Sequence, residues 1–502
     1  MYNAAVDLVD RHLEAGRGAK LAYIDPRRQL PYAELKERTD RLANAIRSLG
    51  VQREQRIVLI MLDTIDFPVA FWATIKAGAV AVPLNTLLPA ELWRYQIEDS
   101  RATVVIVSAE LMDRAGPMLA QVQAAWPLIV LTTEDLARIE AAAAPDGTPA
   151  PTHPDEVAFW LYTSGSTGQP KAARHLHASP AATAQCFGQG ILGITADDVM
   201  FSAAKLFFAY GLGNGMSFPL SVGATTILLP DRPTPDTVLA TVAAHHPTIF
   251  CGVPTLYAAM LADPRLSRGL GSRRLRACIS AGEALPAEIG TRWRERVGLD
   301  IVDGIGSTEM LHIFVSNRLG DIRYGSSGKP VPGYRAQIVN EQGDPTPAGE
   351  IGELMVSGPT AAEGYWNQRE RSRKTFVGEW TMTGDKYRID EDGYYHFCGR
   401  TDDMFKTGGI WVAPFEVESA LISHPAVLEA AVVGHPDSDE LIKPRAFLVL
   451  NPGFHLDDRL VDELRSHVKA VAGPWKYPRW IEAVAELPKT ATGKIQRFKL
   501  RT

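Results

Sequence analysis

Short apolar runs alternate with helix-like stretches over most of this chain, and this alternation limits the possible folds more than any other feature. The segment "RIVLIMLDT" (Arg56 to Thr64) is rich in Ile, Val and Leu, as a buried strand should be. Just before it, Leu35, Leu42 and Ile46 recur along one face of a helix that Gly50 can end. Strands that alternate with helices predict parallel βαβ units and therefore an α/β core.

The pattern changes near Tyr334, where short segments with Gly and Asp turns indicate antiparallel strands. Beyond "GRTDDMFKTGG", roughly a hundred residues mix helices and strands, which is the size of a small domain. A chain of 502 residues is too long for one compact core. We predict a large N-terminal domain (residues 1–401) of α/β subdomains plus a small antiparallel β-subdomain, followed by a small α+β C-terminal domain (residues 402–502).

Charge and composition exclude several classes of protein. The 52 basic and 58 acidic residues give a formal charge of −6 and form no basic block, which argues against nucleic acid or an anionic membrane as the main partner. No apolar run reaches the roughly 18 residues that a membrane span needs. The 4 cysteines are far apart, which argues against disulfides and zinc and favours a reducing cytoplasm.

The N-terminus lacks the uninterrupted apolar core of a signal peptide. Instead, Ala5, Leu8, Val9 and Leu13 recur at helical spacing. This spacing predicts a short amphipathic helix that packs on the body of the protein.

The segment "YTSGSTGQPKAARH" (Tyr162 to His175) follows the strand-like run "EVAFWLY" and has the composition of a phosphate-binding loop. Backbone N–H groups, the hydroxyls of Ser164, Ser166 and Thr167, and the Lys171 ammonium could surround polyphosphate oxygens. The segment is not a Walker A loop, because Lys171 does not follow Gly168 and Ala172 replaces the Ser/Thr that would bind magnesium. A solvated Ser/Gly linker is the alternative.

Further polar segments follow along the chain. In "GIGSTEM" a glycine turn after the strand "DIVD" presents Thr308 to a phosphate and Glu309 to Mg²⁺, or else Ser307 or Thr308 caps a helix start. In "MTGD" a tight turn presents Asp385, which could accept hydrogen bonds from a ribose diol. Arg400 precedes "TDDMFKTGG", and Lys494 lies in "PKTATGKIQR". Any one of these segments alone is more often an ordinary turn.

Taken together and in this order, the segments closely resemble the adenylate-forming superfamily of acyl-CoA synthetases, carrier-protein adenylation domains and luciferases. The resemblance covers essentially the whole chain. It implies that a loop closes over the β,γ-phosphates of ATP, and that loop comprises Thr163, Ser164, Gly165, Ser166, Thr167, Gly168 and Lys171. It also implies that Thr308 and Glu309 serve the α-phosphate and Mg²⁺.

The resemblance assigns roles to residues near the C-terminus as well. Asp385 and Arg400 match the residues that hold the ribose, and Lys494 matches the lysine that contacts the reacting carboxylate and the α-phosphate. Asp402 matches the hinge about which a mobile C-terminal domain turns. That rotation would bring "KTGG", with Gly408 and Gly409, to line the channel for the thiol of coenzyme A.

Segments around the candidate acid site resemble the benzoate-CoA ligase branch of this superfamily. These segments are "AAKLFFAYGLGNG", "AGEAL" and "EMLHIFVSN". Phe208 matches the aromatic gate, and the other candidates would surround a flat ring: Ala209, Tyr210, Gly282, Gly306, His312 and Ile313. The alternative is that the aromatic residues belong to the core and that His312 is an ordinary buried histidine.

The expected activity is an ATP-dependent aryl-CoA ligase that uses Mg²⁺ and coenzyme A. It would activate benzoate or a substituted benzoate through an acyl-AMP and release AMP and pyrophosphate. Alternatives are a medium-chain acyl-CoA synthetase, an acyl-AMP ligase that loads a carrier protein, and a non-catalytic nucleotide-binding scaffold. A homodimer is the commonest default for a soluble enzyme.

Overall fold

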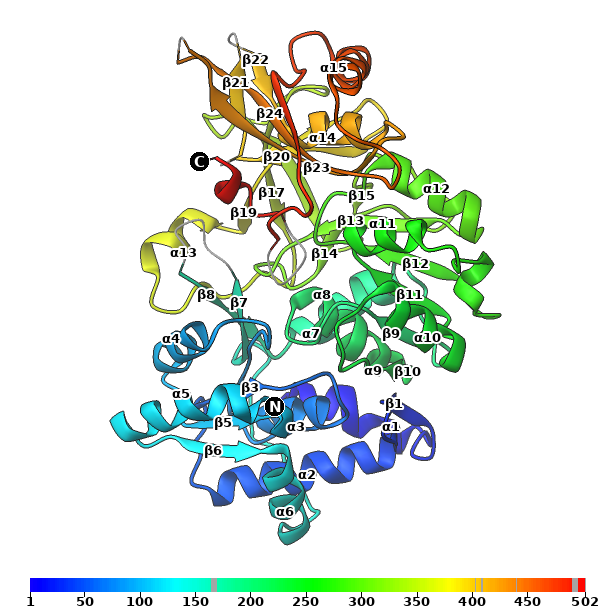
Figure 1. Ribbon diagram of the computed structural model, residues 1–502. Coiled ribbons are helices and arrows are strands. Elements are labelled where there is room, and N and C mark those ends of the chain that lie inside the picture. Colours follow the sequence, from blue (N-terminus) through cyan, green and yellow to red (C-terminus); the bar gives the residue numbers. More distant parts are fainter. Residues whose placement is uncertain (164–168, 402, 408–409, 439, 490–494, 502) are drawn as a thin grey trace.

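The computed structural model describes residues 1–163, 169–401, 403–407, 410–438, 440–489 and 495–501. Two large, mostly parallel sheets form most of the molecule, and a smaller antiparallel sheet adjoins them. The C-terminal elements lie at one end of the molecule, and the six-stranded sheet lies at the opposite end (Figure 1). This large α/β part with a small C-terminal part is the predicted fold class.

The first sheet has six strands, and all neighbouring pairs are parallel except the last. In spatial order they are β6 (Ile129–Thr132), β5 (Val104–Val107), β3 (Arg56–Ile60), β4 (Val80–Pro83), β7 (Val157–Thr163) and β8 (Lys171–Leu176). Ile57 and Leu59 of β3 pack in one buried cluster and Val58 and Ile60 in another, because successive side chains of a strand face opposite sides. Helices cover both faces: α2 (Tyr32–Ser48), α3 (Asp66–Lys76) and α6 (Thr133–Ala142) with the first cluster, α4 (Ala90–Ser100) and α5 (Met112–Ala125) with the second.

The second sheet has nine strands, and its central strands are again parallel. Their spatial order is β15 (Lys329–Pro330), β14 (Ile313–Ser316), β13 (Ile301–Gly306), β12 (Ala277–Ser280), β11 (Ile249–Gly252), β9 (Val199–Ser202), β10 (Thr225–Ile227), β1 (Leu21–Ile24) and β2 (Gln29–Pro31). The accompanying helices are α7 (Ser179–Thr183), η3 (Ala184–Gln189), α8 (Ala209–Leu212), η4 (Gly213–Ser217), α9 (Phe218–Val222), α10 (Pro235–His245), α11 (Pro254–Ala262) and α12 (Ala287–Val297).

The third sheet is antiparallel throughout, as the Gly- and Asp-rich turns predict. Its strands are β16 (Arg335–Val339), β17 (Gly352–Ser357), β18 (Phe376–Val377), β19 (Trp380–Ile389) and β20 (Tyr395–Arg400), with α13 (Arg369–Thr375) before β18. The prediction of a tight turn at "MTGD" is wrong, because these residues lie inside β19. Gly384 has a positive φ of 73° within an irregular stretch of the pairing between β17 and β19, which makes a bulge in the strand rather than a reversal of the chain.

Among its described residues, the C-terminal part contains a two-stranded hairpin, a three-stranded sheet, two α-helices and the short 3-10 helix η6 (Arg497–Leu500). The strands and α-helices are β21 (Phe405–Thr407), β22 (Ile410–Val412), α14 (Pro414–Ile422), β23 (Val427–Pro436), β24 (Ile442–Leu450), α15 (Asp458–Ala472) and β25 (Trp480–Ala483). The segments "AVLEAAVVGH" and "PRAFLVL" correspond to β23 and β24, which pair with each other, so helices and strands mix here as predicted.

The predicted N-terminal helix forms as η1 (Val6–Asp10) and α1 (Arg11–Glu14). Ala5, Leu8 and Val9 are buried as predicted, but Leu13 is exposed and His12 is buried instead. The reason is that η1 is a π-helix, whose wider turn moves the buried face by one position.

Two other expectations concern membranes and cysteines. Among the described residues, no helix is both long and apolar enough to cross a membrane. The cysteines Cys186, Cys251, Cys278 and Cys398 are free thiols.

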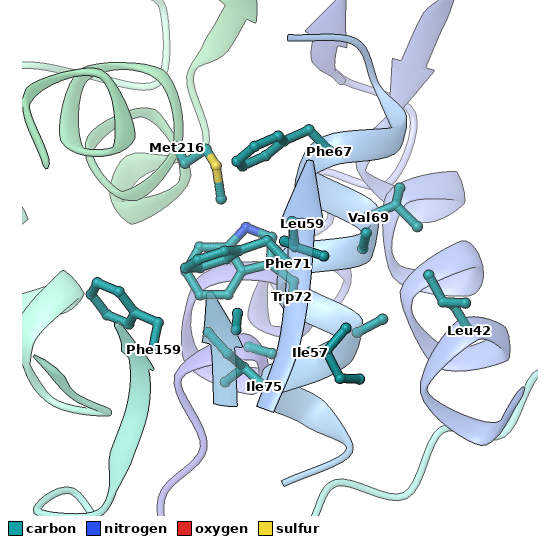
Figure 2. Packing of buried hydrophobic residues seen from close by; sticks show 14 of the residues in the cluster. Leu42, Ile57, Leu59, Phe67, Val69, Phe71, Trp72, Ile75, Phe159 and Met216 are labelled. Atoms are coloured by element: carbon teal, nitrogen blue, oxygen red, sulfur yellow. The ribbon is translucent and has the colours of Figure 1, made fainter. Parts of the chain in front are cut away.

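An aromatic cluster on α3 joins the two large sheets. Figure 2 shows Phe67, Phe71 and Trp72 between Met216 of η4 and Phe159 of β7. The ring of Phe71 lies 5.0 Å from Trp72 and 5.5 Å from Phe159, measured between ring centres, and Phe71 is fully buried. The strand that leads into the Gly/Ser loop is thus packed directly on α3.

We predict that Phe71→Ala destabilises the protein by about 3–5 kcal/mol, because it leaves a cavity at this junction. Phe454→Ala is the matched control, since Phe454 is 42% exposed and its loss should cost under about 0.5 kcal/mol. Urea denaturation followed by tryptophan fluorescence measures both variants. Equal losses of stability in Phe71→Ala and Phe454→Ala would contradict the role of Phe71 in packing the two sheets together.

Candidate functional site

The Gly/Ser loop joins the ends of β7 and β8. Thr163 is the last residue of β7 and pairs with Lys171, the first residue of β8. Ser164, Gly165, Ser166, Thr167 and Gly168 lie outside the described residues. The structure therefore fixes both ends of the loop on adjacent antiparallel strands, and it places the Lys171 side chain beside residues from two other segments.

Lys171, Tyr365 and Glu309 form one connected polar cluster. The Lys171 ammonium donates to the Tyr365 hydroxyl at 2.6 Å, and that hydroxyl donates to Oε1 of Glu309 at 2.6 Å. The Lys171 Nζ atom also lies 3.4 Å from the same carboxylate oxygen and 4.1 Å from the centre of the Tyr365 ring. Three segments that are far apart in the chain thus meet at one carboxylate.

The charge of Glu309 depends on this cluster. Burial alone would raise the pKa of its carboxyl, but the Lys171 ammonium and the Tyr365 hydroxyl outweigh burial and hold the pKa below its ordinary value. Glu309 is therefore a carboxylate at neutral pH although its side chain is only 15% exposed. A buried carboxylate with oxygen lone pairs suits a hard cation.

The segment Ser307 to His312 is a turn between β13 and β14, and no helix begins there. Ser307 accepts a hydrogen bond from the Met310 amide at 3.2 Å, so it caps a turn rather than a helix. The expected glycine turn is also displaced, because Gly304 and Gly306 lie within β13. A Cβ on Gly306 would meet the His312 carbonyl oxygen at 2.5 Å, so the glycine permits the close approach of the two strands.

Thr308 and Glu309 follow β13 directly and remain partly accessible. The Glu309 carbonyl accepts a hydrogen bond from the Ala362 amide at 2.8 Å, which fixes the turn to the segment that carries Tyr365. The structure thus places Lys171 beside Glu309, and Thr308 precedes Glu309 in the same turn.

Asp385 and Arg400 lie opposite each other on β19 and β20. The Arg400 guanidinium donates to Oδ1 of Asp385 at 2.8 Å. The bulge at Gly384 precedes Asp385, and the Thr401 amide donates to the Gly384 carbonyl at 3.0 Å. The two predicted sugar-binding residues are therefore neighbours, although a strand bulge and not a turn positions them.

Tyr210, Gly306 and Ile313 belong to one region of the second sheet. Tyr210 lies on α8, and its hydroxyl donates toward the carbonyls of Ile279 and Gly252 at 3.1 and 3.2 Å, at the ends of β12 and β11. Gly306 pairs with Ile313 across β13 and β14. Ala209 precedes Tyr210 on α8, and Phe208 is the residue before that helix.

His312 is buried among aromatic rings. Its ring centre lies 4.5 Å from Phe218, 5.2 Å from Phe187 and 5.5 Å from Tyr210. Nε2 lies 3.3 Å from the Tyr210 carbonyl, and burial lowers the pKa of the imidazole to about 3. His312 is therefore neutral at pH 7, and its ring packs against the ring of Tyr210.

Gly282 lies beyond the end of β12 with a φ of 95°, and a Cβ there would meet no atom within 4 Å. Its backbone thus borders open space, and only a residue tolerant of positive φ suits the position. Among the described residues, no hydrogen bond joins Gly282 to Tyr210 or to His312.

Four predicted site residues besides the loop lie outside the described residues, namely Asp402, Gly408, Gly409 and Lys494. Their neighbours are described. Asp403 accepts hydrogen bonds from Arg497 at 3.4 Å and from Arg501 at 2.5 Å, and Lys489 forms a bridge with Ile495. The residues that follow Lys494 therefore contact Asp403, and Lys489 and Ile495 pair on the two sides of residues 490–494.

Sequence reasoning missed three buried polar residues around the site. Tyr365 links Lys171 to Glu309. His175 of β8 lies near Glu309, and burial lowers its pKa to about 4 although Glu309 opposes the shift. Asp303 of β13 is buried, and burial raises its pKa to about 8. Asp303 stands in the quoted motif "DIVDGIG", so a charged residue inside an apolar strand was the available signal.

The donor set suits magnesium better than a transition metal. Among the described residues, no three His, Cys, Asp or Glu side chains cluster as metal ligands. Glu309 offers one carboxylate and Thr308 one hydroxyl. This sparse set of oxygens fits Mg²⁺, which keeps several waters and completes its shell with substrate phosphates.

Comparisons with known proteins cover the whole chain. The family model described as AMP-binding enzyme matches residues 10–366, and the AMP-binding enzyme C-terminal domain matches residues 416–494. A benzoate-CoA ligase from Thauera aromatica is 54% identical over 100% of this chain and 96% of that protein. A 4-hydroxybenzoate-CoA/benzoate-CoA ligase from Rhodopseudomonas palustris is 52% identical over 100% of this chain and 94% of that protein.

The structural comparison gives the same result. A benzoate CoA ligase from Burkholderia xenovorans superposes with a TM-score of 0.94 at 49% identity and covers 100% of both chains. An anthranilate CoA ligase solved with anthranoyl-AMP also gives 0.94, at 43% identity over 99% of this chain and 96% of that one. The predicted fold class is confirmed.

We predict that Lys171→Met destabilises the protein by about 3 kcal/mol at pH 7.5, because Glu309 would remain buried and charged without its cation. The pKa of Glu309 lies below its ordinary value, so the pair stabilises the fold above the unfolded pKa, and this contribution is lost as pH falls through the folded pKa. The difference in Tm between wild type and variant should therefore shrink toward pH 4.

Lys374→Met is the matched control for this measurement. Lys374 and Glu370 form an exposed pair with side chains 75% and 83% accessible, so its loss should leave Tm nearly unchanged. A Lys171→Met effect as small as that of the control, or one that grows toward pH 4, would contradict the assigned role of the cluster.

Proposed function

Because the chain belongs to the AMP-binding enzyme family, we propose that it is an ATP-dependent aryl-CoA ligase of the benzoate type. The predicted membership of the adenylate-forming superfamily, in the benzoate-CoA ligase branch, is confirmed by the full-length similarities. The reaction would convert benzoate or a substituted benzoate to its AMP anhydride and then to its CoA thioester. ATP and coenzyme A are the substrates that accompany the acid.

One observation supports this proposal most: the turn that carries Glu309 lies next to the aromatic side chains of Tyr210 and His312. Thr308 and Glu309 lie in the turn between β13 and β14, and Gly306 and Ile313 are the paired strand residues that flank it. Tyr210 contacts His312 of the same turn. A flat, apolar ring would fit between such side chains with its carboxylate toward the turn.

The first half-reaction joins two anions, so the site must neutralise charge. We propose that Lys171 and the loop hold the β,γ-phosphates, Thr308 the α-phosphate, and Asp385 with Arg400 the ribose. Magnesium held by Glu309 would supply positive charge at the phosphates. Holding the carboxylate in line with the α-phosphate can lower the barrier by up to about 7–11 kcal/mol.

Lys494 would contact the reacting carboxylate and the α-phosphate during this step. Its ammonium stabilises the negative charge that builds up as the acid oxygen attacks phosphorus. Pyrophosphate then leaves, and the acyl-AMP remains. The thiol of coenzyme A attacks the acyl carbonyl next and displaces AMP.

In the second half-reaction the thiol of coenzyme A must reach the acyl carbonyl, so Lys494 would have to move away from it. We place a hinge at Asp402, between a domain of residues 1–401 and a mobile domain of residues 402–502. Its rotation would withdraw Lys494 and bring Gly408 and Gly409 to the thiol channel. We further propose a cytoplasmic location and a homodimeric assembly.

A direct assay tests the proposed function. The protein is incubated with ATP, Mg²⁺, coenzyme A and a panel of aromatic and medium-chain acids, and the thioesters are identified by mass spectrometry. Benzoate or a substituted benzoate should give the highest kcat/KM. Three other outcomes would contradict the proposal. A preference for a medium-chain acid would indicate a medium-chain acyl-CoA synthetase, and acyl-AMP without thioester would indicate a ligase that loads a carrier protein. No product with any acid would indicate a non-catalytic scaffold.

We predict that Lys494→Ala abolishes most adenylation but leaves thioester formation from supplied benzoyl-AMP largely intact. The reason is that the lysine would act on the acid and the α-phosphate and not on the thiol. Rapid-quench measurement of each half-reaction checks this. Equal losses in both half-reactions would show that Lys494 has another role.

A further inference from the structure

Asp63 is a buried carboxylate that no step above uses. It lies in the loop after β3, and its side chain is 5% exposed. The Leu206 amide donates to both oxygens of this carboxylate, at 3.3 Å each. The loop after β3 of the six-stranded sheet is thus hydrogen-bonded to the backbone of the segment that follows β9 of the nine-stranded sheet.

Lys205, the residue before Leu206, completes this contact. Its Nζ atom lies 4.0 Å from Oδ2 of Asp63 and donates to the carbonyls of Pro230 at 3.3 Å and Asp231 at 2.6 Å. The Lys205 side chain is only 13% exposed. Its charge is therefore shared between Asp63 and the carbonyls that follow β10.

Lys205 and Leu206, which Asp63 holds, make close contacts with α8 and η4, so their position determines that of α8. The Phe208 amide donates to the Lys205 carbonyl at 3.0 Å. A Cβ on Gly211 would meet that same carbonyl oxygen at 2.0 Å, so α8 rests directly on Lys205. A Cβ on Gly215 would meet the Leu206 side chain at 2.6 Å, so η4 rests on Leu206.

Ala209 and Tyr210 lie on α8, and Phe208 immediately precedes it. A shift of the Lys205–Leu206 backbone would therefore move the residues proposed to contact the aromatic acid. The nucleotide residues lie on other elements: Lys171 on β8, Glu309 after β13, Asp385 on β19. A change in the contact between Asp63 and Leu206 should therefore move the residues proposed to bind the acid and not those proposed to bind the nucleotide.

We propose that Asp63 is a positioning residue for the aromatic acid: its ionised carboxylate fixes the Lys205–Leu206 backbone and, through it, α8 with Tyr210. This inference rests on the proposed function for the identity of the substrate. The mechanical link between Asp63 and α8 does not.

The charge of Asp63 makes this link sensitive to pH. Burial raises the pKa of its carboxyl to about 6, although Lys205 and the Leu206 amide oppose the shift, and Asp231 in turn acts on Lys205. Above this pKa the carboxylate holds the segment, and below it the protonated group binds Lys205 and the amide more weakly. The folded pKa lies above the unfolded one, so ionisation of Asp63 lowers the stability of the fold at neutral pH.

Asp63→Asn tests the proposal, since it removes the charge and keeps the shape. At pH 7.5 the variant should raise the KM for benzoate about tenfold and leave the KM for ATP within about twofold. Its Tm at pH 7.5 should equal or exceed that of the wild type. The benzoate KM of the wild type should rise between pH 7.5 and pH 5.5, whereas that of Asp63→Asn should stay flat over this range.

Asp198→Asn is the matched control. The Asp198 side chain is also 5% exposed and pairs with Arg276 at 2.8 Å. Its hydrogen bonds go to Thr195, Thr248 and Arg276, none of which lies on α8. This variant should lower Tm, because it breaks a buried pair, while the benzoate KM keeps the wild-type pH dependence. A benzoate KM unchanged in Asp63→Asn, or a pH dependence that survives in it, would overturn the proposal.

Hydrogen exchange separates this proposal from the proposed function. Exchange of the peptide spanning residues 203–216, corrected for intrinsic rates, should be faster in Asp63→Asn than in the wild type at pH 7.5 and should speed up in the wild type at pH 5.5. If the wild type turns over no acid, the proposed function fails, and the exchange data still decide the link. Unchanged exchange in both comparisons would refute it.

Discussion

The contact among the Lys171 ammonium, the Tyr365 hydroxyl and the Glu309 carboxylate is the interaction on which the rest of the site depends. A buried carboxylate without a cation would be costly, and here its partner comes from the strand that follows the Gly/Ser loop. The same contact fixes the turn that carries Thr308. The ion pair and the Tyr365 hydroxyl therefore connect the first residue of β8 to the turn and to the proposed metal ligand.

The surrounding fold explains how so few polar contacts suffice. Lys171, Thr308, Glu309 and Arg400 lie at or near the end of a strand, and apolar clusters hold the strands of the two large sheets. The acid side of the site is held differently, because α8 is short and follows a segment without regular structure. Asp63 and Lys205 supply the missing support at the junction of the two sheets, where Phe71 and Met216 also pack.

The sequence predicted those features that depend on local pattern. The alternation of apolar residues identified β3 and α2, and the motif "GIGSTEM" identified Thr308 and Glu309. It did not predict Tyr365, which is 194 residues from Lys171 and 56 from Glu309, because its partners are set by the packing of distant segments. The bulge at Gly384 was missed for the same reason, since it depends on a neighbouring strand of the sheet. The sequence left open whether His312 lines the acid site or is an ordinary buried histidine, because this depends on its neighbours in the fold.

The central claim is that a carboxylic acid and ATP react at this site before any thiol is needed. Exchange of labelled pyrophosphate into ATP, measured with Mg²⁺ and without coenzyme A, tests it most directly. We expect pyrophosphate exchange that requires an aromatic acid and saturates with the concentration of that acid. Exchange that is absent with every aromatic acid, or that proceeds equally well with no acid present, would contradict it.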